Sequence, residues 1–261
     1  MKIGIIGGGN MGGAIARGVV SAGVISPSDL TVSDPSEAVR ESFKAFNPAI
    51  HTTDNNVSAV VGADIVIVAV KPWLMEQVIG QIASTIDRNR QMVISVAATI
   101  TFDMLGNYLG GGKIPPLFRV VPNTAISLSE SATFIASHGA SEGQVETVKA
   151  LFSPLGKVWL VEQSLISAVT ALSSSGIAYV FRYIDAAVKG GEELGISRPE
   201  GLQIMLQTVR GALAMLEHNH TQPQTEIDKV TTPGGLTLKG LAAMEENGFT
   251  HAVIEGLKAT K

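Results

Sequence analysis

The feature that most constrains this chain is a glycine-rich turn near its amino terminus. Residues 2–6 form a short apolar run, and Gly7-Gly8-Gly9-Asn10-Met11-Gly12 follows with the spacing G-x-G-x-x-G. Apolar residues at helical spacing continue to Ala22, so the motif stands between a predicted strand and a predicted helix. There, the first glycine makes a tight turn, the second lets the backbone approach a diphosphate, and the third allows close helix packing. The motif therefore predicts dinucleotide binding.

Strand and helix patterns alternate along the first part of the chain. Apolar, β-branched runs that are typical of buried strands recur at 30–33, 64–70, 92–96, 117–121, 133–136 and 158–161. Helical patterns occupy 36–46 and 142–152. This alternation predicts a doubly wound α/β sheet of the Rossmann type over residues 1–163.

The strand patterns stop after Gln163. A helix is predicted over 164–194 and ends at Gly195. Ser197 and Glu200 have capping-box spacing and open a second helix towards residue 216. Further helices are predicted after 233–235 and over 251–258. We expect an α/β fold in which an N-terminal Rossmann domain (1–163) precedes an all-α domain (164–261).

Asp34 is the first candidate for choosing the cofactor. It closes the second strand about 20 residues beyond the last glycine of the motif, where an acid accepts hydrogen bonds from ribose hydroxyls and repels a 2′-phosphate. This favours NADH. Ser33, Ser36 and Arg40 offer an alternative phosphate pocket, so the choice between NADH and NADPH stays open.

The loop Ala69-Val70-Lys71-Pro72 follows the third apolar strand, at the carboxyl edge where ligands of such sheets bind. Lys71 either faces the cofactor or is a solvated lysine that ends a strand.

Composition excludes several classes of function. Nineteen basic and 23 acidic residues are scattered, which disfavours nucleic-acid binding. No run approaches the roughly 20 apolar residues of a membrane span. The absence of cysteine excludes disulfides and zinc-thiolate sites and favours a cytoplasmic location. His218 and His220 point to different helix faces, and the other histidines lie alone, so no metal site is expected. A mean hydropathy of +0.29 with 16% charged residues predicts a homo-oligomer that hides apolar surface.

Taken together, several segments resemble pyrroline-5-carboxylate reductase over nearly the whole chain. Besides the glycine motif, the matching segments are A-V-K-P at 69–72, S-V-A-A at 95–98, R-V-V-P-N-T at 119–124, A-Y-V-F at 178–181 and T-P-G-G-L-T at 232–237. The resemblance implies NAD(P)H-dependent reduction of the cyclic imine 1-pyrroline-5-carboxylate to L-proline, the last step of proline biosynthesis. It also implies a homodimer, extended in many members to a ring of dimers, with active sites between subunits.

The resemblance assigns two groups of binding residues. Those lining the cofactor are Gly7, Gly8, Gly9, Asn10, Met11, Gly12, Asp34, Asn56, Ala69, Val70, Lys71, Pro72 and Ala97. Those binding the substrate are Ser175, Gly234, Gly235, Leu236 and Thr237.

The chemistry of imine reduction makes Thr237 the candidate catalytic residue. A protonated imine is already a good electrophile, so a hydroxyl that donates to the ring nitrogen or relays a proton is sufficient. The backbone N–H groups of Gly234, Gly235 and Leu236, at a helix start, suit the substrate carboxylate. Alternatively, Thr237 is an ordinary residue of a first helical turn.

Two departures from the family pattern keep alternatives open. Ser174 and Ile177 replace a glycine and a proline in the usual S-G-S-G-P-A-Y, and Lys229 stands where asparagine is common. A reductase of another cyclic imine and a dinucleotide-binding regulatory protein without turnover therefore remain alternatives. A β-hydroxyacid dehydrogenase is disfavoured, because that class uses a lysine early in the long helix and the first lysine here is Lys189.

Overall fold

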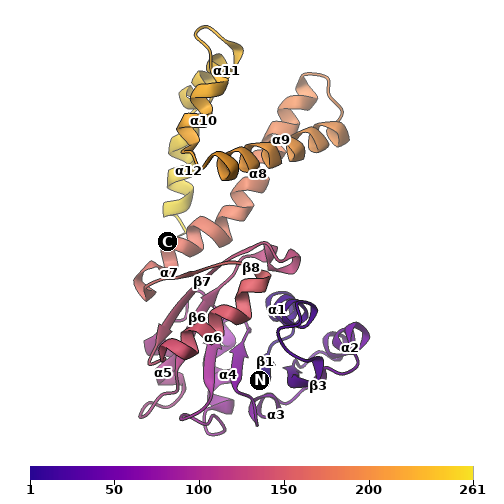
Figure 1. Ribbon diagram of the computed structural model, residues 1–261, viewed down its shortest axis with the longest axis vertical. Coiled ribbons are helices and arrows are strands. Elements are labelled where there is room, and N and C mark those ends of the chain that lie inside the picture. The colour runs from indigo at the N-terminus through magenta and orange to yellow at the C-terminus, as the bar shows by residue number, and fades with distance from the viewer. Residues whose placement is uncertain (261) are drawn as a thin grey trace. The chain divides into compact units, whose positions relative to one another are not determined.

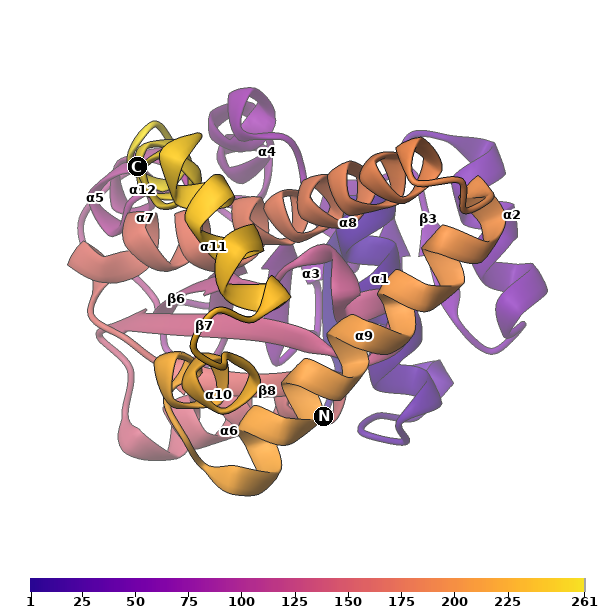
Figure 2. The same cartoon turned by 90° about the horizontal axis from the view of Figure 1, so that it is seen from above.

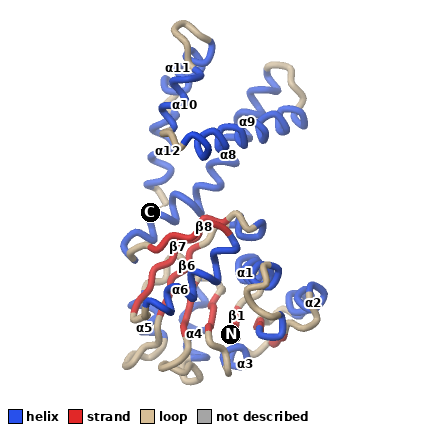
Figure 3. Tube along the Cα trace, in the orientation of Figure 1, coloured by secondary structure: helices blue, strands red, loops and turns tan. Residues whose placement is uncertain are grey.

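The computed structural model describes residues 1–260 of the chain. The chain divides into two compact units, a first unit of Met1–Ser174 and a second that begins at Ser175. All strands of the described residues belong to the first unit, and the second unit is helical throughout (Figure 3). The expected α/β fold followed by an all-helical part is confirmed.

The first unit is built on one eight-stranded sheet in the order β3-β2-β1-β4-β5-β6-β7-β8 (Figure 1). Its strands are β1 (Ile3–Ile6), β2 (Leu30–Ser33), β3 (His51–Thr53), β4 (Ile65–Val68), β5 (Met92–Ser95), β6 (Leu117–Val121), β7 (Ser131–His138) and β8 (Gly156–Leu160). All neighbours are parallel except β6 and β7, which pair antiparallel. The chain therefore winds in both directions from β1, as a doubly wound sheet requires.

Helices cover both faces of this sheet. The helices of the first unit are α1 (Asn10–Ser21), α2 (Glu37–Phe46), α3 (Asn56–Val60), α4 (Met75–Ile82), α5 (Phe102–Tyr108), α6 (Glu142–Phe152) and α7 (Ile166–Val169). Ile5 and Phe118 point into one core with residues of α1, α2 and α6, whereas Val66 and Val93 point into the other with residues of α3, α4 and α5. Figure 2 shows α4 and α5 on one side of the sheet and α6 on the other. Because both faces are buried, β1 and β4 are apolar throughout.

The helical path from Gln163 to Glu193 is not one regular helix. After a 3-10 turn at Gln163–Leu165 and α7, residues Thr170–Ser175 form a π-helical turn before α8 (Gly176–Glu193). The hydroxyls of Ser173 and Ser174 donate to the carbonyls of Ala132 and Pro122, at 3.3 and 3.2 Å. These bonds tie the π turn to the start of β7 and the end of β6. The 164–194 helix expected from the sequence is therefore corrected to two helices joined by a wider turn.

Residues 163–174 belong to the first unit, and Ile166 is 1% exposed within its core. The domain boundary near residue 163 therefore stays a prediction from the sequence.

The second unit consists of helices alone. Besides α8, these are α9 (Arg198–Asn219), α10 (Pro223–Val230), α11 (Leu236–Glu246) and α12 (Phe249–Lys258). The expected capping box at the start of α9 does not form, because the Ser197 side chain accepts no capping bond. Instead, Arg198 binds Asp185 of α8 at 2.6 Å and Glu192 at 3.0 Å. Ion pairs between the helices therefore accompany the start of α9.

Much apolar surface of this unit is exposed. Phe181, Leu194 and Leu236 are 63%, 85% and 85% exposed. Within residues 1–260, the path Gln163–Glu193 is long and apolar enough to cross a membrane by length and composition, and 11% of its most apolar window is buried. The sequence prediction concerned an uninterrupted apolar run, and serine and threonine residues interrupt the run here.

Candidate active site

The carboxyl ends of four parallel strands meet at one edge of the sheet. Ile6 of β1 pairs with Ser33 of β2 and with Val68 of β4. Val68 in turn pairs with Ser95 of β5. The segments that follow these strands carry the glycine motif, Asp34, Ala69–Pro72 and Ala97, so the fold gathers the predicted cofactor residues at its switch point.

The first position of the glycine motif, Gly7, requires glycine because of its backbone conformation and its close contact with Ala69. Gly7 has a φ of +94°, a conformation that other residues rarely adopt. A Cβ atom there would lie 2.7 Å from the carbonyl oxygen of Ala69. The N–H of Gly7 donates to the Ser33 carbonyl at 2.8 Å, which ties the start of the glycine loop to the end of β2.

Gly9 and Gly12 differ in what surrounds them. A Cβ on Gly12 would lie 1.9 Å from the carbonyl oxygen of Gly7, so this glycine permits the close approach of α1 to the turn. A Cβ on Gly9 would meet no atom within 4 Å. Gly9 is also the N-cap of α1, and no side chain caps the first N–H groups of the helix, which leaves them as donors for a ligand. The turn therefore fits a diphosphate, which a larger side chain at Gly9 would obstruct.

Asp34 is part of the same turn. Its Oδ2 accepts a hydrogen bond from the N–H of Gly8 at 2.8 Å, and its Oδ1 accepts one from the N–H of Ser36 at 2.9 Å. The acid thus holds the glycine loop and the β2–α2 turn together. A ribose hydroxyl would bind at the remaining lone pairs of these oxygens.

Ser33, Ser36 and Arg40, the alternative pocket for a 2′-phosphate, already use some of their hydrogen-bonding groups within the protein. The Ser33 hydroxyl is buried and donates to Oδ1 of Asn56 at 2.8 Å. Ser36 caps α2 by accepting a hydrogen bond from Val39 at 3.4 Å. Nη1 of Arg40 donates to the carbonyls of Asp34 and Pro35, at 2.8 and 2.9 Å. Arg40 therefore remains beside the end of β2, with further guanidinium N–H groups as donors.

Two further turns complete this edge. The N–H of Ala69 donates to the carbonyl of Ile6 at 2.8 Å, which holds the 69–72 loop against the end of β1. Lys71 is exposed in that loop. Ala97 is 7% exposed, and its N–H donates to the Ser95 hydroxyl at 3.3 Å.

A hollow of about 830 Å³ lies beside the glycine loop, with Gly9 and Asn10 among the residues that line it.

The predicted substrate residues belong to other elements. Ser175 ends the π-helical turn, and Gly234, with a φ of +75°, leads into α11. The N–H of Gly235 donates to the Thr232 carbonyl at 2.8 Å, so this donor of the predicted set is already used within the turn. Thr237 is exposed in the first turn of α11. Within residues 1–260, no hydrogen bond joins Ser175 to this turn.

Arg119 of β6 is a residue to which the sequence analysis gave no role. Its side chain is 4% exposed, and burial lowers the pKa of its guanidinium below the ordinary value. The available signal was a charged residue inside the apolar strand pattern of 117–121. Among residues 1–260, no group of three or more His, Cys, Asp or Glu side chains is arranged to hold a metal ion.

Two family models match the chain. Residues 163–261 match pyrroline-5-carboxylate reductase dimerisation, and residues 2–99 match NADP oxidoreductase, coenzyme F420-dependent. The pyrroline-5-carboxylate reductase of Synechocystis sp. is 33% identical over 99% of this chain and 95% of its own. That of Pseudomonas aeruginosa is 34% identical over 99% of this chain and 93% of its own. A solved Plasmodium falciparum pyrroline carboxylate reductase with NADP bound has a TM-score of 0.90 and 26% identity, covering 100% of this chain and 95% of that one.

Proposed function

The chain belongs to the pyrroline-5-carboxylate reductase family, and from this premise we propose that it reduces 1-pyrroline-5-carboxylate to L-proline with a reduced nicotinamide dinucleotide. The observation that carries the proposal is the open turn at Gly9, which leaves room for a diphosphate in a chain similar to these reductases over its whole length. The reaction is the last step of proline biosynthesis.

The first unit binds the cofactor in this proposal. The N–H groups at the start of α1 hold the diphosphate, with Gly8, Asn10 and Met11 at its side. Asn56, Ala69–Pro72 and Ala97 line the rest of the site at the same sheet edge. When bound, the reduced dinucleotide supplies the hydride, and the chain supplies its position and the exclusion of water.

For cofactor choice, we expect NADH to be used at least as well as NADPH. Asp34 lies where it accepts from a ribose hydroxyl, and its negative charge repels a 2′-phosphate. Arg40 is the residue that would favour a 2′-phosphate instead, because it lies against the backbone of Asp34 and Pro35.

The second unit supplies the substrate groups. The N–H groups of Gly234 and Leu236, and the hydroxyl of Ser175, bind the imine carboxylate. Gly235 contributes the tight turn rather than its N–H, which is already bonded to Thr232. Thr237 donates a hydrogen bond to the ring nitrogen. As that nitrogen becomes an amine, the hydroxyl relays a proton to it from solvent and is itself restored.

The protein acts as a homo-oligomer. The matched dimerisation residues include the apolar side chains of α8 that are exposed in the single chain, such as Phe181. A second subunit that covers them removes that surface from water. A homodimer, or a ring of dimers, in the cytoplasm is the form that we propose.

A second candidate function is reduction of a different cyclic imine. The observation in its favour is Ser174, whose hydroxyl donates to the Pro122 carbonyl and so ties down the π turn next to Ser175. A shifted Ser175 hydroxyl would suit an imine of another size. Ile177 lies in the first turn of α8, two residues beyond Ser175.

The test is the loss of reduced-nicotinamide absorbance when pyrroline-5-carboxylate is added to the purified protein. NADH and NADPH are run in parallel, and proline is quantified by chromatography. We expect oxidation with stoichiometric proline. Cofactor binding without oxidation of either cofactor would contradict the proposal, and a panel of five- and six-membered cyclic imines then tests the second candidate.

A further inference from the structure

Arg119 is a buried cation without a carboxylate partner. It lies in β6 between apolar neighbours and is 4% exposed. Among residues 1–260 it forms no ion pair, and its Nε has no hydrogen-bond partner. Burying a guanidinium without an ion pair destabilises a fold, so its place in β6 calls for a compensating role.

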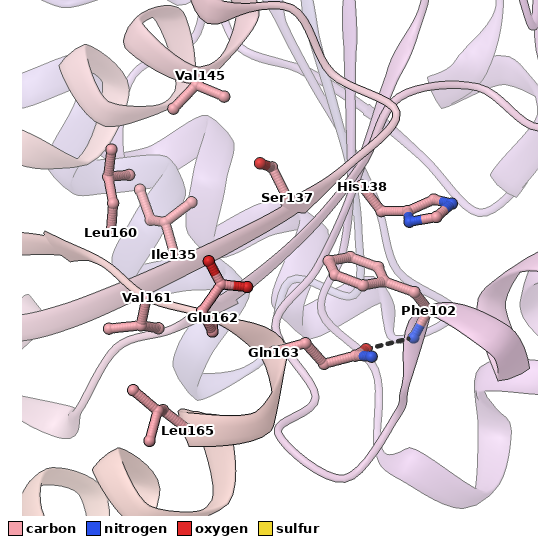
Figure 4. A pocket seen from close by; sticks show the side chains of 10 residues that line it. All are labelled: Phe102, Ile135, Ser137, His138, Val145, Leu160, Val161, Glu162, Gln163 and Leu165. Atoms are coloured by element: carbon pink, nitrogen blue, oxygen red, sulfur yellow. Dashed lines mark hydrogen bonds between the residues drawn. The ribbon is translucent and has the colours of Figure 1, made fainter.

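Both hydrogen-bond partners of Arg119 are connected to residues 96–102, the turn between β5 and α5. Ala98 lies in this turn, and Gln163 is bonded to it. Nη2 donates to the carbonyl oxygen of Ala98 at 2.5 Å. Nη1 donates to Oε1 of Gln163 at 3.2 Å, and the same oxygen accepts the N–H of Phe102 at 2.8 Å. Figure 4 shows this bond between Gln163 and Phe102, beside a hollow of about 580 Å³. Arg119 therefore reaches the 96–102 turn at two points, directly and through Gln163.

The other bonds of this turn lead to the sheet edge described above. The N–H of Val96 donates to the Val68 carbonyl at 3.2 Å, and the N–H of Ala97 donates to the Ser95 hydroxyl. The Phe102 ring packs on His138 with ring centroids 5.5 Å apart. Ala97, which we assigned to the cofactor, thus lies between the strand end and the contacts of Arg119 and Gln163.

We propose that Arg119 is a positioning residue for hydride transfer, which fixes the 96–102 turn through the Ala98 carbonyl and Gln163. The proposal rests on the proposed function, because the turn matters for hydride transfer only if Ala97 lines the cofactor. A planar guanidinium suits the task, since its N–H donors are rigidly spaced and reach two acceptors at once. Displacement of reacting groups by about 1 Å can cost about 100-fold in rate.

The first experiment measures the turn itself without any cofactor. Amide hydrogen exchange of residues 96–102 is compared between the wild type, Arg119→Met and Arg119→Lys. We expect Arg119→Met, which has no donors, to speed exchange there about tenfold. Arg119→Lys keeps one cationic donor group, which does not span both acceptors as the guanidinium does, so it should restore only part of the protection. Unchanged exchange in Arg119→Met would overturn the proposal whether or not the protein is a reductase.

The second experiment measures turnover. In Arg119→Met we expect kcat to fall about tenfold or more, with cofactor Kd within about twofold of wild type. The deuterium isotope effect on kcat, measured with a cofactor deuterated at C4, should rise because hydride transfer becomes slower relative to other steps. Arg119→Lys should recover only part of kcat. A wild-type kcat and isotope effect in Arg119→Met would also overturn the proposal.

Two further variants separate positioning from folding. Gln163→Leu should reproduce the faster exchange and the kinetic change in weaker form, and it serves where Arg119→Met folds poorly. Gln91→Leu is the matched control, because Gln91 is 2% exposed and donates to the carbonyls of Val60 and Ala63, near the start of β4. It should lower thermal stability and leave kcat and the isotope effect unchanged. An equal loss of kcat in Gln91→Leu would reduce Arg119 to a structural residue. Failure of the wild type to oxidise cofactor would reject the function and leave the exchange result intact.

Discussion

The backbone N–H of Gly8 donates a hydrogen bond to Oδ2 of Asp34 at 2.8 Å, so the acid at the end of β2 holds the loop at the end of β1. The other carboxylate oxygen accepts from Ser36. The residue expected to choose the cofactor is therefore also a brace of the diphosphate loop, and a change at Asp34 affects both properties.

Asp34→Asn should separate cofactor choice from bracing of the loop, because it removes the negative charge and keeps a side chain of similar shape. The amide keeps one oxygen acceptor, so one of the two N–H groups loses its partner and stability falls by about 1 kcal/mol. Because the neutral side chain no longer repels a 2′-phosphate, we expect kcat/KM to fall about tenfold for NADH and much less for NADPH. The measurement is kcat/KM for both cofactors beside a thermal melt. Equal losses for both would leave Asp34 a structural brace only.

Asp87→Asn is the matched control for this substitution. Its Oδ1 accepts the N–H of Asn89 at 3.0 Å in a similar turn that precedes β5. Asparagine keeps an oxygen that accepts the Asn89 N–H and loses only the exposed ion pair with Arg90 at 3.9 Å, so stability should fall by less than about 1 kcal/mol. The ratio of NADH to NADPH use should be unchanged.

Thr237→Val tests the proposed proton donor with little change in shape. Because valine cannot donate to the imine nitrogen, kcat should fall about 100-fold or more, while cofactor Kd stays within about twofold. Thr237→Ser keeps the hydroxyl and should retain most of kcat. Unchanged turnover in the valine variant would remove the assigned role.

Thr208→Val provides the comparison on α9. The Thr208 hydroxyl donates to the Ile204 carbonyl at 2.9 Å, a local helix bond without a proposed catalytic part. We expect its turnover to equal that of the wild type.

Local patterns predicted the strands of the first unit except β3, and its helices α1, α2 and α6, but not α3, α4 and α5. The strand at 30–33 and the helix at 142–152 have the predicted bounds, because an apolar run and a capping box act within a few residues. The three-residue strand β3 (His51–Thr53) lacks such a signal, since none of its side chains is apolar. The π turn at Thr170–Ser175 was also beyond local patterns, because its serines bond to residues about 40 to 50 positions earlier.

In the candidate site, too, some residues could be predicted from the sequence and some contacts could not. Gly7 to Gly12 and Asp34 could be found from spacing, because a turn and a strand end fix their places. The double use of the Asp34 carboxylate could not, since Gly8 is 26 residues away. Arg119 shows the same limit, because its partners Ala98 and Gln163 lie 21 and 44 residues from it.

Glu226 should contribute a pH-dependent part of the stability of the second unit. Hydrogen bonds from Lys229, then Thr221 and Asn219, lower the pKa of this carboxyl to about 2. A lowered folded-state pKa stabilises the fold fully above the ordinary value of 4.5, and the contribution is lost as the pH falls towards 2. In urea melts from pH 7 to pH 3, we expect the gap between wild type and Glu226→Gln to be constant above about pH 5 and to shrink below it. A constant gap would contradict this origin.

Gly9→Ala should weaken cofactor binding, whereas Gly12→Ala should lower thermal stability, although both substitutions change the same motif. A Cβ on Gly9 meets no protein atom within 4 Å, so Tm should stay within about 2 °C of wild type. The added methyl group fills the space for the diphosphate, so cofactor Kd should rise about tenfold or more. A Cβ on Gly12 lies 1.9 Å from the Gly7 carbonyl oxygen, which forces α1 away from the turn and lowers Tm by several degrees. The measurements are thermal melts and fluorescence titration with NADH. Destabilisation by Gly9→Ala with unchanged Kd would mean that the open space beside Gly9 has no ligand to hold.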